Sequence, residues 1–173
     1  MPVLAIVGRS GSGKTHLMVK LIKELKGRGL RLATVKHCHH DFDMDQEGKD
    51  SWQHRQAGAS PVVVCTKSRL AIFLETETEM SLERIEARFL SEVDMILVEG
   101  YRSLPLPKVE VTEKGKKSEL AEQGDPNLLA VISHERADCR VPLFLPDQVK
   151  ELADFIYARL LPADRCSPDL SRS

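Results

Sequence analysis

The feature that most constrains the fold is a glycine-rich segment near the start of the chain, Gly8-Arg9-Ser10-Gly11-Ser12-Gly13-Lys14-Thr15. It follows a continuously apolar run, residues 2–7, which is typical of a parallel strand buried on both faces. After it, apolar side chains recur at helical spacing over residues 14–26. A strand, a glycine-rich turn and an amphipathic helix in this order predict a loop that wraps phosphate groups at the N-terminus of the helix.

Every residue of this segment is therefore a predicted phosphate-binding residue. The glycines allow backbone N–H groups to turn inward and surround the phosphates. The Lys14 ammonium is expected to reach the β- and γ-phosphates of a nucleoside triphosphate, and the Thr15 hydroxyl is expected to bind Mg²⁺. The segment thus predicts a triphosphate site with magnesium.

Strands and helices are predicted to alternate along the rest of the chain. Apolar runs predict strands at residues 31–36, 61–66, 70–74, 95–98, 108–111, 128–132 and 142–145. Helices are predicted at residues 49–57, from a Ser81 cap to residue 92, and after an Asp147 cap. This alternation predicts an α/β, P-loop NTPase-like fold with a mostly parallel sheet flanked by helices, and an antiparallel hairpin over residues 61–74.

Composition and charge bound the remaining possibilities. The chain has 173 residues, of which 42% are hydrophobic and 29% charged, which suits one domain with one core. A single nucleotide-binding domain is predicted over residues 1–161, followed by a polar tail, 162–173, and the charged segment 113–124 is predicted to be a mobile loop. The net charge of −1 argues against nucleic acid or membrane partners. Without a charged leader or a membrane-length apolar run, the expected location is cytoplasmic.

A triphosphate site of this kind needs a carboxylate near the end of a neighbouring strand to hold the magnesium. The apolar run 95–98 leads directly into Glu99, and Gly100 lets the chain turn away. Asp94 begins the same strand, whereas ligands of open α/β sheets bind at the carboxyl ends of the strands. Glu99 is therefore preferred to Asp94 as the metal carboxylate, and the alternative is an ordinary surface glutamate.

A second candidate region follows the predicted strand 31–36. Lys36 and His37 stand at the carboxyl end of that strand and are candidate contacts to the nucleotide. In an extended segment, one side would carry His37, His39, Asp41, Asp43 and Asp45. Three interpretations of this segment remain open. It could contact the nucleotide, its Mg²⁺ or a second substrate. It could instead form a zinc-type metal site, or be a solvated polar loop. Arg55, farther along, could contact a phosphate or a carboxylate, but a solvated face is the preferred interpretation.

These motifs, in this order, resemble the MobB family, the adapter protein of molybdopterin-guanine dinucleotide biosynthesis. The resemblance extends from Val3 to about Leu160. Besides the phosphate loop, it rests on Val35-Lys36-His37, Asp41-Phe42-Asp43-Met44-Asp45, Gly48-Lys49-Asp50-Ser51, Arg55-Gln56-Ala57-Gly58-Ala59, Leu97-Val98-Glu99-Gly100-Tyr101 and Pro107-Lys108-Val109-Glu110-Val111. The histidine- and aspartate-rich segment joined to Gly-Lys-Asp-Ser is its most specific part.

The resemblance implies a P-loop fold, GTP with Mg²⁺, a weak GTPase activity and a homodimer. It also implies a partner, the guanylyltransferase that joins GMP to the molybdenum-loaded pterin. The layout is more distantly similar to dethiobiotin synthetase, in which an aspartate and a Val-Glu-Gly glutamate share the magnesium with the loop threonine. By that similarity the metal ligands here are Thr15, Asp50 and Glu99.

Two departures from related nucleotide-binding proteins matter. The chain has no Asn-Lys-x-Asp motif of the kind that reads guanine, so the preference for GTP comes from the resemblance alone and the base-reading residues are not identified. Arg9 stands where some dimerising ATPases carry an extra lysine. The alternatives to an adapter are a small-molecule kinase, a dethiobiotin synthetase-like ATP-dependent ligase, or an interaction module. Beyond a weak GTPase, the sequence leaves open whether the protein is an enzyme.

Overall fold

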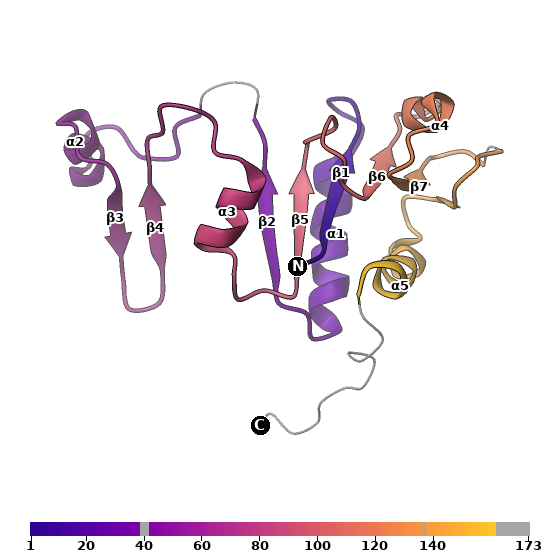
Figure 1. Ribbon diagram of the computed structural model, residues 1–173, viewed down its shortest axis with the longest axis horizontal. Helices are drawn as coiled ribbons and strands as arrows, with labels where there is room; N and C mark the ends of the chain where they lie inside the picture. The colour runs from indigo at the N-terminus through magenta and orange to yellow at the C-terminus, as the bar shows by residue number, and fades with distance from the viewer. Residues whose placement is uncertain (39–41, 137, 162–173) are drawn as a thin grey trace. The chain divides into compact units, whose positions relative to one another are not determined.

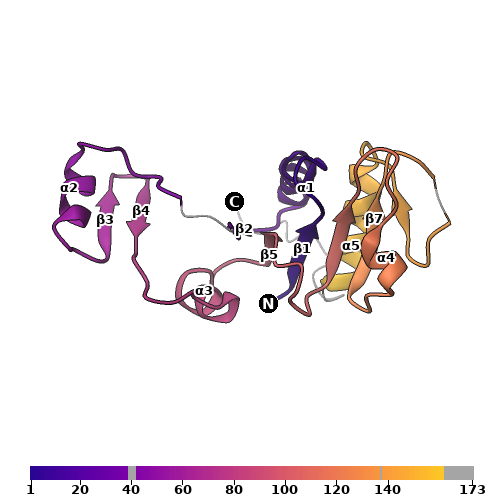
Figure 2. The ribbon, with the colours of Figure 1, turned by 90° about the horizontal axis from the view of Figure 1, so that it is seen from above.

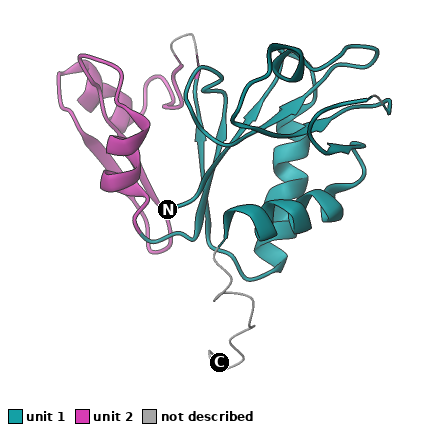
Figure 3. Ribbon diagram, turned by 45° about the vertical axis from the view of Figure 1, so that its right-hand side comes forward, with its two compact units in different colours: residues 1–37, 92–173 teal, residues 38–91 magenta. Residues whose placement is uncertain are grey.

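The structure is a computed structural model that describes residues 1–38, 42–136 and 138–161. The chain forms two compact units, residues 1–37 with 92–173 and residues 38–91, which Figure 3 distinguishes by colour. The single-domain interpretation of residues 1–161 remains a prediction. The predicted polar tail, residues 162–173, lies outside the described residues.

A parallel sheet is the framework of the first unit (Figure 1). Its six strands in the described residues are β1 (Val3–Val7), β2 (Leu32–Lys36), β5 (Met95–Glu99), β6 (Lys108–Val111), β7 (Leu128–Ile132) and β8 (Leu143–Phe144). The strand order is β2-β5-β1-β6-β7-β8, and every neighbouring pair is parallel. This pairing confirms the predicted mostly parallel sheet. The apolar runs, such as β1 and β5, are almost entirely buried, as strands of a parallel sheet usually are.

Two long helices cover the core of the first unit. Helix α1 (Lys14–Gly27) and helix α5 (Val149–Leu160) pack against each other, and Figure 2 shows α1 beside β1. Their apolar stripes are buried together with the strands, and they contribute Leu17, Met18, Leu21, Leu25, Leu152, Ala153 and Ile156. The helical spacing seen in residues 14–26 therefore marks the face that enters the core. Among the described residues, no helix is long and apolar enough to cross a bilayer.

The structure corrects two local predictions in the first unit. Part of the segment predicted as a mobile loop, 113–124, is a short helix, α4 (Glu119–Gln123). The Ser118 side chain caps it by accepting a hydrogen bond from the backbone N–H of Ala121, and Gly124 ends it in a left-handed conformation. The predicted Asp147 cap of α5 is also wrong, because the helix begins after Gln148 and has no side-chain cap.

The second unit contains a helix, a hairpin and a further helix. Its elements are α2 (Asp50–Gln56), β3 (Val62–Cys65), β4 (Leu70–Phe73) and α3 (Leu82–Phe89). Strands β3 and β4 pair in the antiparallel direction, which confirms the predicted hairpin. The Ser81 side chain accepts a hydrogen bond from the backbone N–H of Arg84, which confirms the predicted cap of α3.

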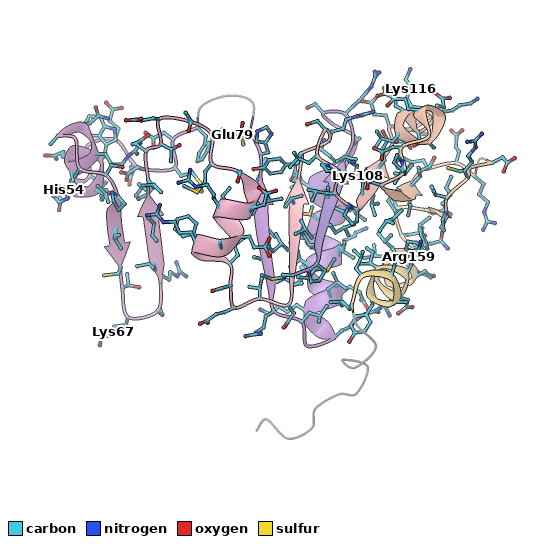
Figure 4. All side chains as sticks on the ribbon, in the orientation of Figure 1. His54, Lys67, Glu79, Lys108, Lys116 and Arg159 are labelled. Carbon is cyan, nitrogen blue, oxygen red and sulfur yellow. The ribbon has the colours of Figure 1, made fainter. Side chains whose placement is uncertain are left out.

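A buried ion pair between Lys108 and Asp125 joins β6 to the turn before β7. The Lys108 side chain is 2% exposed, and its ammonium lies 3.2 Å from the Asp125 carboxylate (Figure 4 labels Lys108). Burial by itself would raise the pKa of Asp125, but the hydrogen bonds from Asn127 and Lys108 outweigh it and leave the pKa below its usual value. The pair therefore stabilises the fold above the pKa of an unfolded aspartate, about 4, and this contribution disappears as the pH falls through the lower folded pKa.

Asp125→Asn should lower the free energy of unfolding by about 3 kcal/mol at pH 7, because it leaves the buried Lys108 charge without a partner. The difference from the unaltered protein should narrow as the pH falls from about 4 through the lower folded pKa of Asp125, below which the native carboxylate is protonated as well. Urea unfolding at pH 7 and at a pH below the folded pKa of Asp125 measures this effect. Asp147→Asn, at an exposed aspartate, is the control and should change stability by less than about 0.5 kcal/mol. Equal effects of the two substitutions would contradict the role of the pair.

Candidate functional site

The predicted phosphate loop lies at the carboxyl edge of the parallel sheet. Strand β1 pairs with β5 on one side and with β6 on the other, so the loop that follows β1 lies between the ends of these two strands. Figure 1 shows this loop and helix α4 at the same edge of the sheet. The predicted residues 8–13 connect β1 to α1, and Lys14 and Thr15 are the first residues of α1. This is the edge at which open α/β sheets bind their ligands.

Two glycines show why the loop needs its sequence. A Cβ atom on Gly8 would lie 2.3 Å from the carbonyl oxygen of Val111 and 2.8 Å from the Ser12 hydroxyl oxygen, so no larger residue fits against β6. Gly13 caps α1 in a left-handed conformation with φ of 95°, which glycine adopts without the steric cost of a side chain. The loop is thus packed closely on β6, and Gly13 leads it directly into α1.

The polar groups of the loop suit an anionic ligand. The Lys14 ammonium donates a hydrogen bond of 2.7 Å to the carbonyl oxygen of Arg9, so it lies across the loop. The Ser12 hydroxyl oxygen is buried and has no hydrogen-bond partner among the described residues. A buried polar atom without a partner is costly, and a phosphate oxygen at the loop can satisfy it. The lysine and the N-terminus of α1 supply the positive charge that phosphates need.

Thr15 and Glu99 are brought together, as predicted from the sequence. The Thr15 hydroxyl lies 3.3 Å from both carboxylate oxygens of Glu99, which is the last residue of β5. The Glu99 side chain is 14% exposed, and the Lys36 ammonium lies 3.9 Å from its carboxylate. A hydroxyl and a carboxylate at the carboxyl edge are oxygen ligands of the kind that Mg²⁺ prefers. Asp94 instead pairs with Arg31 at the start of β5, so it lies away from the loop.

The end of β2 adjoins the same carboxylate. Lys36 is opposite Glu99 in the parallel pairing, and the backbone N–H of His37 donates to the carbonyl oxygen of Glu99. The His37 ring stacks on Tyr101, with ring centroids 4.6 Å apart. Tyr101 has a positive φ of 53°, which is uncommon for a side chain of this size. The predicted nucleotide contacts, Lys36 and His37, therefore lie next to Glu99.

The third predicted metal ligand belongs to the second unit. Asp50 is the first residue of α2 and is exposed, and its place beside Thr15 and Glu99 stays a prediction. His39 and Asp41, two of the side chains expected on one side of the segment after β2, lie outside the described residues. No group of three or more His, Cys, Asp or Glu side chains suited to a metal ion occurs in the part of the chain that is described.

Asp43 and Asp45 are held by an arginine. The Arg55 guanidinium lies 2.9 Å from the Asp43 carboxylate and 3.6 Å from that of Asp45, and it also pairs with Glu75 at 2.9 Å. Its side chain is only 15% exposed and lies over the ring of Phe73, so the preferred interpretation, a solvated face, is wrong and the alternative, contact with carboxylates, is confirmed. The hydrogen bonds from the Asp45 backbone and from Arg55 lower the pKa of Asp43. Within this unit the two aspartates therefore act as partners of Arg55.

Sequence reasoning missed a charged cluster beside the phosphate loop. The Arg9 side chain pairs with Glu119 of α4, and Arg102 pairs with the same carboxylate at 2.9 Å. A cavity of about 170 Å³ adjoins the cluster, and its lining includes Arg9, Glu110, Lys116 and Glu119. The signal that predicts α4 was present, a capping serine at residue 118 and a terminating Gly124. The pairing itself joins residues 110 positions apart and leaves no local pattern.

Known proteins resemble this chain over most of its length. The sequence model of the MobB family, described as molybdopterin guanine dinucleotide synthesis protein B, matches residues 3–134. The molybdopterin-guanine dinucleotide biosynthesis adapter protein of Haemophilus influenzae is 38% identical over 157 residues, covering 90% of this chain and 88% of the relative. The Escherichia coli protein of the same name is also 38% identical, over 162 residues, covering 90% of this chain and 91% of the relative.

Solved structures agree with these sequence matches. A crystal structure described as molybdopterin-guanine biosynthesis protein B has a TM-score of 0.73 and 34% identity, covering 90% of this chain and 97% of that chain. The structure of a MobB homologue from Bacillus stearothermophilus has a TM-score of 0.68 and 26% identity, covering 92% and 100%. With a family match over more than half of its residues and relatives at 38% identity, the chain belongs to the MobB family.

Proposed function

We propose that this protein is a GTP-binding adapter in molybdopterin-guanine dinucleotide biosynthesis, which assists the guanylyltransferase and hydrolyses GTP weakly with Mg²⁺. The observation that carries the proposal is the phosphate loop, with Lys14 across it and the Thr15–Glu99 pair beside it. The adapter role follows from the names of the relatives at 38% identity. The expected location remains the cytoplasm.

Different residues of the site would bind the phosphates, the Mg²⁺ and the rest of the nucleotide. Lys14, which uses one of its three N–H donors on the carbonyl oxygen of Arg9, would bind the β- and γ-phosphates with the others, and the backbone N–H groups of the loop would bind the remaining phosphate oxygens. Thr15 and Glu99, with Asp50 as the proposed third ligand, would hold Mg²⁺, which neutralises charge on the phosphates. Lys36 and His37, next to Glu99, would contact the nucleotide or its metal shell.

Weak hydrolysis agrees with the charges around the loop. Phosphoryl transfer is accelerated by an oriented attacking group and by added positive charge on the transferred phosphoryl group. The arginine within the loop, Arg9, is paired with Glu119. A site of this kind holds GTP while accelerating its cleavage little, as suits a protein that serves the chemistry of a partner enzyme. A small-molecule kinase or ligase would instead consume the triphosphate quickly once its substrate is present.

The hairpin of the second unit supports the proposed homodimer. On one face of β3 and β4, the side chains of Val63, Leu70 and Ile72 are 52%, 65% and 44% exposed. The two outer strand edges of the hairpin pair with no other strand in the described part of the chain. A two-stranded sheet with an exposed apolar face and free edges of this kind is a typical surface for association with a second copy. We therefore expect the two copies to associate through the hairpins.

The first test is reconstitution with purified guanylyltransferase, molybdopterin, Mg²⁺ and limiting GTP. Addition of this protein should increase dinucleotide formation, whereas Lys14→Ala should add little. Calorimetry should show that Lys14→Ala loses about 2 kcal/mol of GTP binding energy, roughly thirty-fold, because a charge-assisted contact with phosphate is removed. No increase with the unaltered protein, together with no complex between the two proteins, would refute the adapter role. Rapid phosphorylation or ligation of another small molecule would favour an enzyme.

Glu99→Gln should reduce the Mg²⁺-dependent part of GTP affinity by about ten-fold, while affinity in EDTA changes little, since a metal-binding carboxylate is lost. Titration of GTP with and without Mg²⁺ measures the difference. Glu151→Gln, at an exposed position of α5, is the matched control and should keep the metal dependence. The same metal dependence in Glu99→Gln as in the unaltered protein would contradict the assignment.

Val63→Lys should shift the dimer towards monomer at micromolar concentration, because it places a charge in the proposed apolar contact. Sedimentation equilibrium measures the shift. Val19→Lys changes a valine of similar exposure, 47%, on α1 and should leave the mass unchanged. A monomer mass for the unaltered protein, or a dimer that tolerates Val63→Lys, would exclude association through this face.

A further inference from the structure

The carboxylate of Glu119 lies between two arginines at the edge of the phosphate loop. The Arg9 Nε donates a hydrogen bond of 2.7 Å to Glu119 Oε1, and the Arg102 guanidinium donates one of 2.9 Å to Glu119 Oε2. Arg9 belongs to the phosphate loop, whereas Glu119 is the first residue of α4. An anionic side chain of the protein therefore occupies the position beside Arg9 that a phosphate oxygen of a ligand would favour.

Buried groups fix Glu119 in this position. The Glu110 side chain on β6 is only 4% exposed, and it accepts hydrogen bonds from the Ser118 hydroxyl and from the backbone N–H of Leu120. Ser118 in turn caps the helix. Arg102 lies 3.5 Å from the Glu110 carboxylate as well, so it joins the buried acid to Glu119. Helix α4 is thus anchored on β6, and its first side chain is directed at the loop.

Arg9 is restrained through its backbone as well as its side chain. Its carbonyl oxygen accepts the hydrogen bond from the Lys14 ammonium, at 2.7 Å. The ammonium has three N–H donors, so Lys14 can bind phosphates and still hold this carbonyl oxygen. The cavity of about 170 Å³ beside Arg9 and Glu119 leaves room for the two side chains to separate. The Arg9 side chain is 65% exposed, so no packed core resists such a movement.

We propose that Glu119 is a positioning residue that competes with bound triphosphate for the Arg9 guanidinium, and that it thereby holds down the affinity for GTP and the rate of its hydrolysis. The inference rests on the proposed function, since it assumes that GTP occupies the loop. Release of Arg9 from Glu119 adds a positive charge next to the phosphates. When Arg9 moves from Glu119 to a phosphate, the Glu119 carboxylate still has Arg102 as its partner.

Glu119 is an anion at neutral pH and so remains a competitor there. The hydrogen bond from Arg9 lowers the pKa of this carboxyl, the charges of Arg9 and Arg102 act in the same direction, and partial burial opposes them. Both partners in the Arg9–Glu119 pair are substantially exposed, at 65% and 35%. Exposed pairs contribute modestly and weaken with salt, so a polyphosphate with several charges can displace the carboxylate.

The test compares Glu119→Gln with Glu122→Gln, which changes a glutamate of the same helix that lines the same cavity. Glu119→Gln should bind GTP about three- to five-fold more tightly and hydrolyse it faster at saturation, with the gain largest at low salt. Glu122→Gln should stay within about two-fold of the unaltered protein. Glu119→Asp, which keeps the charge, should remain closer to the unaltered protein than Glu119→Gln.

The gain has to depend on Arg9. In an Arg9→Ala background, Glu119→Gln should change neither affinity nor rate, whereas a purely structural role of Glu119 would produce the same change in both backgrounds. Calorimetry and single-turnover hydrolysis give the two readouts. Unaltered or weaker GTP binding by Glu119→Gln, or a gain that persists without Arg9, would overturn this inference alone. Failure of the unaltered protein to bind GTP would overturn both it and the proposed function.

Discussion

The parallel pairing of β1 between β5 and β6 is the constraint on which the rest of the site depends. It places the loop after β1 beside Glu99 on one side and against the Val111 carbonyl oxygen on the other. The first contact joins the Thr15 hydroxyl to a carboxylate, and the second requires a glycine at residue 8. The proposed phosphate and metal ligands therefore lie together because three strands end at one edge.

Strand β6 carries charged residues in a position where parallel strands usually carry apolar ones. Lys108 and Glu110 are 2% and 3% exposed, and each has a partner that lies beyond the strand. Lys108 holds Asp125 in the turn before β7, and Glu110 holds the start of α4. These two buried contacts determine where α4 lies, and α4 then delivers Glu119 to the phosphate loop. The far side of the loop is thus organised by charges rather than by apolar packing.

The second unit follows a different principle. Arg55 gathers Asp43, Asp45 and Glu75 around one guanidinium that also lies over Phe73, so a short helix and a hairpin are joined by charge and by an aromatic ring. The hairpin leaves Val63, Leu70 and Ile72 exposed. A unit with few buried apolar residues and an exposed apolar face suits the association proposed above.

The sequence by itself determined the glycine-rich loop between β1 and α1, the alternation of strands and helices, and Glu99 as the candidate metal carboxylate, because each leaves a local pattern of spacing or residue type. Only the tertiary structure decided the strand order and the pairing of Arg9 with Glu119. That pairing joins residues 110 positions apart, and no local pattern records such a distance. The tertiary structure likewise decided the partner of Asp43 and Asp45, which is Arg55. A charged side chain pairs with the opposite charge that the fold brings near.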